Sequence, residues 1–220
     1  MLRILGLLLA VVTGCSFGPG NLQTSRSTDL EKRRIRRIAV LPPEMASEEQ
    51  KPKAPFTSPS PARTKTPERQ APELLANLIY STMASMPNWQ IVSESEIREI
   101  EQGVPHTNGV ARIRKLGQLV YADAVITGRV QRYRERVGDE WGAKSPASVA
   151  FVLDVIDVRR GDIIWSARFD ETQKSLSENI FAIGDISQRG VRWLSAAQLT
   201  QAGVKKAVSQ LHELLVRSSS

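Results

Sequence analysis

The sequence contains little of what most enzyme active sites need. In 220 residues it has one cysteine and two histidines, and aromatic residues make up only 5%. A single cysteine excludes an intramolecular disulfide and a thiolate metal cluster. The scarcity of aromatic side chains disfavours a deep aromatic ligand pocket and a surface on which nucleic-acid bases stack. The composition therefore favours a protein that is not an enzyme.

The start of the chain has no apolar run long enough to span a bilayer, but it is typical of an export signal. Arg3 precedes a short apolar run from Ile4 to Val12, whereas a spanning helix needs about 20 such residues. The run ends in the tetrapeptide VTGC at positions 12–15, which resembles the lipobox of bacterial lipoproteins. That resemblance implies cleavage after residues 1–14 and acylation of Cys15. The alternative is a plain signal peptide followed by an incidental cysteine.

The residue after Cys15 is Ser16 rather than aspartate. By resemblance to the sorting rule of Gram-negative lipoproteins, Ser16 implies release to the outer membrane, with the protein facing the periplasm. Acyl chains such as palmitate would anchor it there. Residues 15–34 are expected to form a flexible, basic tether. Its basic residues either contact anionic headgroups or, as the simpler interpretation, form a solvated segment ahead of the first strand.

A proline-rich segment interrupts the folded region. Residues 35–41 predict a strand, and the continuous apolar run at 38–41 suits a strand covered on both faces. Eight of the twelve prolines then lie between Pro42 and Pro72. We therefore expect residues 43–71 to be a disordered or polyproline-like insertion within a domain spanning residues 35–217. A docking arm of the PxxP type is a less favoured interpretation of this segment.

The periodicity of apolar residues predicts the remaining elements. Strands are expected at 89–92, 122–134, 148–158 and 162–171, and helices at 72–86, 93–102, 110–120 and 204–215. Ser93 and Glu96 have the spacing of a capping box. This order predicts a single α/β sandwich domain, with a mixed β-sheet faced by helices and preceded by the signal and tether.

The polar residues that catalysis uses do not converge in the sequence. The candidates are His106 and His212, Asp154 and Asp157, and Asp139 with Glu140. Neither histidine has a cysteine or a second histidine at ligand spacing, so no zinc site is expected. Asp154 and Asp157 lie three residues apart on a strand, which directs them to opposite faces. Hydrolysis of cell-wall glycan is therefore the weakest function considered, and we expect no catalytic residue, cofactor or metal.

Four arginines follow one predicted strand: Arg129, Arg132, Arg134 and Arg136. Regular alternation would direct the last three to one face and Arg129 to the other. A nucleic-acid surface would need aromatic residues between them, and only Tyr133 is present. We therefore expect a solvated face, or one that contacts an acidic protein partner.

Four segments together resemble the CsgG/LpoB-type lipoprotein superfamily, which is related in fold to the N-terminal domain of TolB. They are RRIAVLP at 36–42, WQIVSESEI at 89–97, LGQLVYADAVITGRV at 116–130 and LDVIDVRRGDIIWS at 153–166. The likeness extends over residues 35–217 and implies a fold more than a task. One departure is Pro43, where the family pattern has phenylalanine. Another is the segment 134–146, which is too short and too charged for the membrane hairpins of a CsgG-type pore.

Signal, composition and resemblance together predict a non-catalytic periplasmic lipoprotein on the outer membrane. It would be an accessory or assembly factor for an envelope machine, in peptidoglycan synthase activation or in secretion or appendage assembly, with an envelope protein as its partner. An oligomeric secretion-channel-type component of the CsgG class, built from copies of this chain, is the alternative. A tether of roughly 20 residues would reach at most about 70 Å, which is short for an LpoB-like activator that crosses the cell wall.

Overall fold

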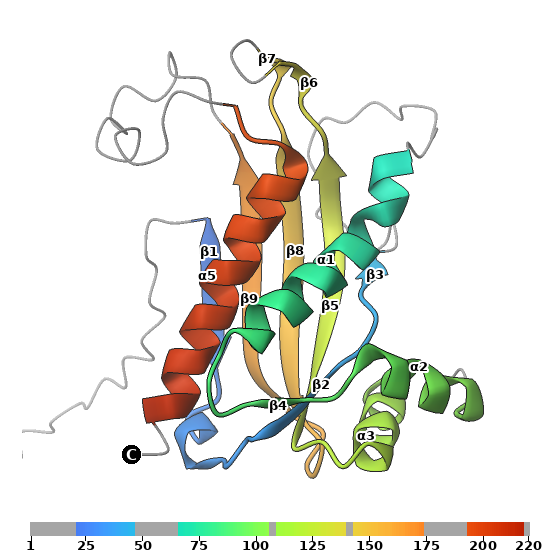
Figure 1. Cartoon of the computed structure of the whole chain (residues 1–220). Coiled ribbons are helices and arrows are strands. Elements are labelled where there is room, and N and C mark those ends of the chain that lie inside the picture. The colour runs from blue at the N-terminus through green and yellow to red at the C-terminus, as the bar shows by residue number, and fades with distance from the viewer. Residues whose placement is uncertain (1–20, 47–65, 106–108, 140–142, 174–192, 218–220) are drawn as a thin grey trace, which may run out of the picture.

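The computed structural model describes residues 21–46, 66–105, 109–139, 143–173 and 193–217 (Figure 1). A mixed sheet of seven strands has the order β1-β9-β8-β5-β2-β4, with β3 also beside β5. The strands are β1 (Leu22–Arg26), β2 (Arg37–Val40), β3 (Glu44–Met45), β4 (Gln90–Ile91), β5 (Ala124–Arg134), β8 (Ser148–Asp157) and β9 (Ile163–Thr172). A separate small hairpin pairs β6 (Val137–Gly138) with β7 (Ala143–Ser145). The predicted α/β domain with a mixed sheet is confirmed.

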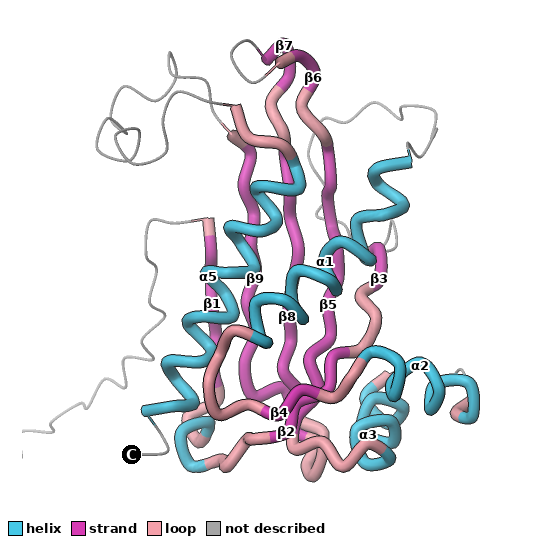
Figure 2. The backbone as a smooth tube through the Cα atoms, in the orientation of Figure 1, coloured by secondary structure: helices cyan, strands magenta, loops and turns pink. Residues whose placement is uncertain are grey.

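The helices form a layer on each side of the sheet, as Figure 2 shows. They are α1 (Thr66–Ala84), α2 (Glu94–Gly103), α3 (Val110–Leu119) and α5 (Ala196–Arg217), with a short 3-10 helix η1 (Leu30–Lys32). Helices α1 and α5 lie side by side across the long strands. Helices α2 and α3 lie at the opposite face, near β2 and the start of β5.

Two apolar clusters hold these layers together. The larger one joins α1 and α5 to the sheet, with Leu75, Leu211, Phe151, Trp165 and Phe169 among its fully buried members. The smaller one joins α2 and α3 to the other face, and it consists of Ala39, Leu41, Val92, Ile97, Leu116, Val120, Ala122, Val125 and Val158. The second cluster reaches only the end of the sheet where β5 begins, so the rest of that face has no apolar cover from these helices.

Local sequence explains where two of the helices begin. Ser93 caps α2 as predicted, because its Oγ accepts a hydrogen bond from the Glu96 amide at 3.3 Å. Helix α1 begins at Thr66, six residues earlier than expected, and Pro72 lies inside it. A proline there removes one helical hydrogen bond, but the neighbouring Ala71 and Leu75 are buried against the sheet and hold the turn in place.

The predicted tether over residues 15–34 differs from the structure in its second half. Residues Leu22–Arg26 form the edge strand β1, which pairs antiparallel with β9 from Leu22 opposite Phe169 to Arg26 opposite Trp165. Helix η1 then places Leu30 fully inside the larger cluster. A short edge strand with polar residues on its outer face resembles a linker in composition. The folded domain therefore begins well before residue 35.

Other predictions fall partly or wholly on residues that the structure does not describe. Residues 1–14, Cys15 and Ser16 lie outside the described part of the chain, as do 47–65 in the middle of the proline-rich insertion. The ends of that insertion are ordered, since β3 pairs with β5 and α1 already extends from Thr66.

Candidate functional site

One face of the sheet carries a polar surface that we call the open sheet face. Within the described residues, no helix packs over the part of this face beyond α2 and α3. By strand register, its side chains are Gln23, Ser25, Thr127, Arg129, Arg132, Ser148, Val152, Asp154, Ser166, Arg168 and Asp170. They come from β1, β9, β8 and β5, so rigid neighbouring strands fix their positions.

A β-bulge brings the arginines of β5 together on this face. Arg129 lies opposite Val152, and Arg132 lies opposite Ala150, with a register shift between Val130 and Arg132. The prediction that Arg129 points away from Arg132 is therefore wrong. A bulge sets two residues of one strand opposite one residue of its partner, which reverses the alternation from there on. Arg134, opposite Ser148, follows on the same face.

Arginine and aspartate side chains alternate across the open sheet face. Arg129 Nη2 lies 3.2 Å from Asp154 Oδ2, and Ser166 Oγ donates to Asp154 Oδ1 at 2.6 Å. Asp154 is thus buried with both oxygens bonded. Arg132 pairs with Asp170, and its Nε also donates to Ser148 Oγ at 2.6 Å. These contacts hold the charged groups in a fixed pattern while leaving the arginines partly exposed.

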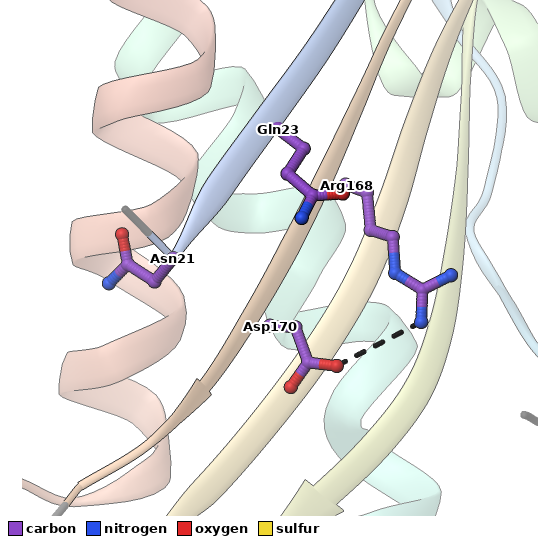
Figure 3. Close-up of a pocket in the computed structure, with 4 residues that line it drawn as sticks. All are labelled: Asn21, Gln23, Arg168 and Asp170. Atoms are coloured by element: carbon purple, nitrogen blue, oxygen red, sulfur yellow. Dashed lines mark ion pairs between the residues drawn. The ribbon is translucent and has the colours of Figure 1, made fainter. Parts of the chain in front are cut away.

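A shallow hollow of about 280 Å³ lies where this face meets the β1 edge (Figure 3). It is lined by Asn21 and Gln23 and by Arg168 and Asp170 of β9. Arg168 Nη2 lies 3.9 Å from Asp170 Oδ2, and both side chains are about two-fifths exposed, at 42% and 43%. The hollow therefore offers one cation, one anion and two amides to solvent, a donor set that binds polar groups and lacks an acid–base pair for hydrolysis.

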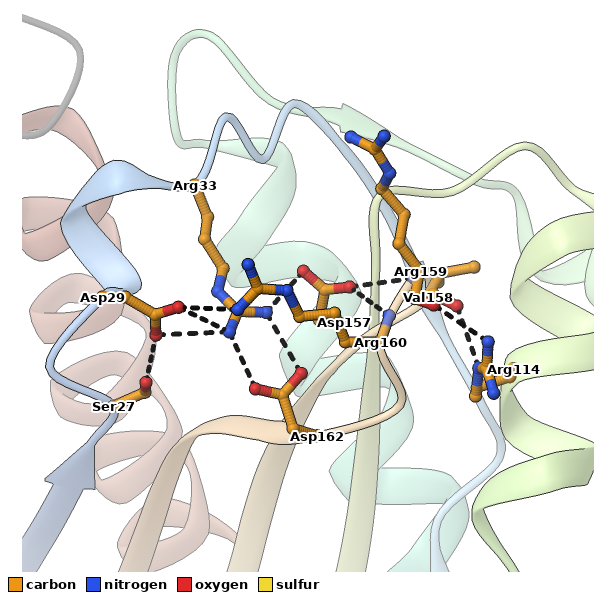
Figure 4. Close-up of polar contacts among 9 residues, drawn as sticks. All are labelled: Ser27, Asp29, Arg33, Arg114, Asp157, Val158, Arg159, Arg160 and Asp162. Carbon is orange, nitrogen blue, oxygen red and sulfur yellow. Dashed lines mark hydrogen bonds and ion pairs between the residues drawn. The ribbon is translucent and has the colours of Figure 1, made fainter.

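A second polar cluster, which we call the Arg33 cluster, lies at the end of the sheet where β8 turns into β9 (Figure 4). The Arg33 guanidinium lies 2.9 Å from Asp29, 2.7 Å from Asp157 and 2.7 Å from Asp162. Its side chain is only 10% exposed. Arg160, at 2.9 Å, also pairs with Asp29. The cluster fastens the β8–β9 turn to the segment around η1.

The charges in this cluster shift one another's pKa. The Ser27 hydroxyl, which donates to the Asp29 carboxylate, and then the Arg33 guanidinium lower the pKa of Asp29 to about 2. The Arg33 guanidinium also lowers the pKa of Asp162, and Asp162 in turn raises the pKa of Arg33. Arg33 is therefore not part of a solvated segment, which was the simpler interpretation of this basic stretch; it stays charged and partly buried because three carboxylates surround it.

The candidate catalytic residues remain apart. Asp154 and Asp157 lie on opposite faces as predicted, the first bonded to Arg129 and the second to Arg33. His212 Nε2 donates to the Pro87 carbonyl at 3.0 Å and its ring meets Trp89 edge-on, with centroids 5.0 Å apart.

The remaining candidate residues provide no catalytic or metal-binding group within the described ranges. Asp139 is exposed, whereas His106 and Glu140 lie outside the described residues. In the described ranges, no three or more His, Cys, Asp or Glu side chains are grouped to hold a metal. None of the helices in those ranges is long and apolar enough to cross a membrane.

Comparison with known proteins shows similarity only at the level of structure. No family model matches the chain, and no curated protein matches it. The fold is similar to the PelC dodecamer from Paraburkholderia phytofirmans, with 15% identity, 87% of this chain and 96% of that chain covered, and a TM-score of 0.46. It is also similar to lipoprotein GNA1162 from Neisseria meningitidis, with 16% identity, coverage of 70% and 95%, and a TM-score of 0.37.

The LpoB C-terminal domain from Escherichia coli is a further structure of similar fold. It is 13% identical, the match covers 63% of this chain and 83% of that chain, and the TM-score is 0.38. LpoB also gives its name to the superfamily that the sequence motifs resemble. At these identities and scores the likeness is limited to the general arrangement of elements, and no family follows from it.

The sequence pattern does not predict two parts of the site. Gln23 belongs to the open sheet face only because β1 pairs with β9, and β1 lies in the predicted tether. The Arg33 cluster joins residues more than a hundred positions apart, such as Arg33 and Asp157. A local signal existed for one contact, since Asp29 and Arg33 have the i, i+4 spacing of an ion pair.

Proposed function

We propose that this chain is a non-catalytic lipoprotein of the outer membrane that faces the periplasm and binds an envelope protein. Cys15, freed by cleavage of residues 1–14, carries the acyl chains. The partner is a peptidoglycan synthase or a component of a secretion or appendage assembly machine. The lipobox-like VTGC at 12–15, holding the only cysteine of the chain, supports the anchor.

The open sheet face is the observation that carries the binding function. Its arginines are bonded to aspartates and still partly exposed, with Arg129 and Arg168 both at 42%. Charged groups held on paired strands lose little conformational freedom on binding, which favours specific recognition of a partner with complementary charges. A hydrolase would need two convergent carboxylates, and Asp154 and Asp157 are divided by the sheet.

The anchor is tested by labelling cells with a fatty acid that can be detected on the protein. We expect the full chain to incorporate the label, and Cys15→Ala to lose it and leave the membrane fraction. Ser16→Asp is the matched variant, because it keeps Cys15 and changes only the residue that the sorting rule reads. It should retain the label and move away from the outer membrane. A labelled Cys15→Ala chain would contradict the proposed anchor.

The partner is tested by placing a photoreactive amino acid at Arg129 in the anchored full chain, with Glu73 on the exposed side of α1 as the control position. We expect crosslinks from position 129, and not from position 73, to a peptidoglycan synthase or an assembly component identified by mass spectrometry. A ladder that contains only copies of this chain would contradict the accessory role and support the oligomeric channel component. Turnover of wall glycan that one Asp or Glu variant abolishes would contradict both.

A further inference from the structure

Because β1 is part of the folded sheet, the connection between the domain and its anchor at Cys15 is short. The first described residue on the anchor side is Asn21, directly before β1. It is fixed by three contacts: its carbonyl accepts from the Asp170 amide at 2.9 Å, its side-chain oxygen accepts from Lys206 Nζ at 3.1 Å, and its amide donates to Glu171. Five residues separate Cys15 from Asn21, and the six Cα–Cα steps between these two residues span at most about 20 Å when fully extended.

This span is much shorter than the reach of at most about 70 Å that the sequence pattern predicts for a tether of roughly 20 residues. Because the first strand lies at one edge of the sheet, the anchor leaves the domain at that edge and not at its centre (Figure 1). A domain tied by so few residues has its β1 edge at the membrane surface. Helices α2 and α3, which contact β2 and β5, lie on the opposite side of the domain from the β1 edge.

The side chains around Asn21 suit a surface of lipid phosphates. Lys205 and Lys206 of α5 are exposed, and Arg168 is partly exposed beside the hollow. The acids here are already bonded, Asp170 to Arg132 and Arg168, and Glu171 to the Asn21 amide. Exposed cations close to an anchored surface are attracted by anionic headgroups within about a Debye length, on the order of 10 Å.

We infer that the edge formed by β1, the end of β9 and the middle of α5 lies against the membrane that holds Cys15, with Lys205, Lys206 and Arg168 at anionic phospholipid headgroups. The inference rests on the anchor proposed above. It also limits the partner, which must present its binding surface within reach of the same membrane. A protein held in this way does not cross the wall to a distant synthase.

The test measures energy transfer from a dye on the lipidated full chain to acceptor-labelled headgroups in vesicles of phosphatidylethanolamine and phosphatidylglycerol. Acylation consumes the Cys15 thiol, so one introduced cysteine takes the dye. Gln210→Cys places it on α5, one turn from Lys206 on the same face, and Glu99→Cys places it on α2. We expect transfer at least about twofold more efficient from position 210, because at most about 20 Å of chain lies between anchor and β1. Equal transfer, or more from position 99, would overturn the inference.

Further variants separate the effect of the short connection to Cys15 from the effect of the lysines at the headgroups. A flexible spacer of about 20 residues inserted between Gly18 and Pro19 should abolish the difference between positions 210 and 99, because it lengthens the reach several-fold. An unchanged difference would overturn the role of the short connection. The double variant Lys205→Ser, Lys206→Ser should lower transfer from position 210, whereas Lys115→Ser on α3 should leave it unchanged. Identical transfer in the double variant would overturn the headgroup contact.

Failure of the anchor and failure of this orientation give different results. A chain that incorporates no fatty acid contradicts the proposed function and the inference with it. A chain that is acylated and bound to vesicles, yet shows no preference for position 210, contradicts the orientation alone.

Discussion

At the scale of single residues, Tyr121 has a strained backbone conformation. It follows the end of α3 with a φ of 54°, in the left-handed region, and the residue is 84% exposed. A glycine commonly ends a helix in this conformation because it has no Cβ to clash with the backbone. We expect Tyr121→Gly to raise the free energy of unfolding by about 0.5–1 kcal/mol, measured by urea denaturation of the Cys15→Ala chain.

The control for Tyr121 is Asn88, which has a φ of 68° and is also exposed. Asparagine tolerates the left-handed region better than tyrosine, so Asn88→Gly should give a smaller gain. If Tyr121→Gly lowers the stability instead, the ring makes contacts that offset the backbone cost.

The Arg33 cluster predicts a loss of stability in acid. The Ser27 hydroxyl and the Arg33 guanidinium lower the pKa of Asp29 to about 2, from an ordinary value of 3.8. A carboxylate whose pKa is depressed in the folded state stabilises the fold above its unfolded pKa, and that contribution disappears as the pH falls through its folded pKa. We therefore expect unfolding experiments to show stability decreasing between about pH 4 and pH 2.

Variants assign this acid sensitivity to Asp29. Asp29→Asn should be less stable than the parent at neutral pH and should lose less stability between about pH 4 and pH 2, because its side chain cannot take up a proton there. Ser27→Ala keeps the carboxylate and removes one donor, so its pH dependence should lie between the two. If the stability of Asp29→Asn and of the parent falls equally with decreasing pH, groups other than Asp29 cause the loss of stability in acid.

At the scale of elements, α5 approaches the sheet closely at Gly203. A Cβ there would lie 2.8 Å from two atoms of the Phe169 ring, and this ring stacks on Phe151. Alanine is normally favoured over glycine in a helix, but here the ring cannot move aside. We expect Gly203→Ala to lower the free energy of unfolding by about 1–3 kcal/mol in a urea titration.

Gly103, the last residue of α2, is the matched control for this crossing. A Cβ at Gly103 would meet nothing within 4 Å, so Gly103→Ala should be neutral or slightly stabilising. Equal effects of the two alanines would mean that α5 shifts away from the sheet without cost.

The elements that the sequence predicts well are those with a strong local signal. Strand β9 alternates buried Trp165, Ala167 and Phe169 with polar residues, and Ser93 caps α2. Regular alternation with Trp165 predicts that Ile163 is buried too, but Ile163 is 53% exposed and Ile164 is buried instead, because the register shifts opposite Ile156. Such bulges depend on the partner strand, which periodicity within one segment does not report.

The same reasoning explains what the sequence predicts of the candidate site. The sequence predicts that the arginines of β5 lie on one strand, but only the bulge before Arg132 places Arg129 on the same face as Arg132. The aspartates opposite them come from β8 and β9, so their pairing needs the sheet order. Polar surfaces assembled from several strands are therefore the part of such a fold least visible in a sequence.

At the scale of the whole molecule, the segment before residue 35 belongs to the folded domain. Leu30 is fully buried, β1 covers the edge of β9, and Arg33 neutralises Asp157, which is only 8% exposed. Removing this segment would expose the backbone groups of β9 and leave a buried carboxylate without its cation. Burial of Leu30 alone contributes about 2 kcal/mol, and an unpaired buried charge costs more.

We therefore expect a chain that begins at residue 35 to be less stable by several kcal/mol than one that begins at residue 20, both lacking Cys15. Urea unfolding compares their midpoints, and light scattering after gel filtration compares their masses. The shorter chain should also self-associate, because the uncovered edge of β9 can pair with another strand. Identical midpoints and masses would show that β1 is dispensable. In that case the connection to Cys15 is effectively as long as the sequence pattern predicts, and the domain is free to move away from the membrane.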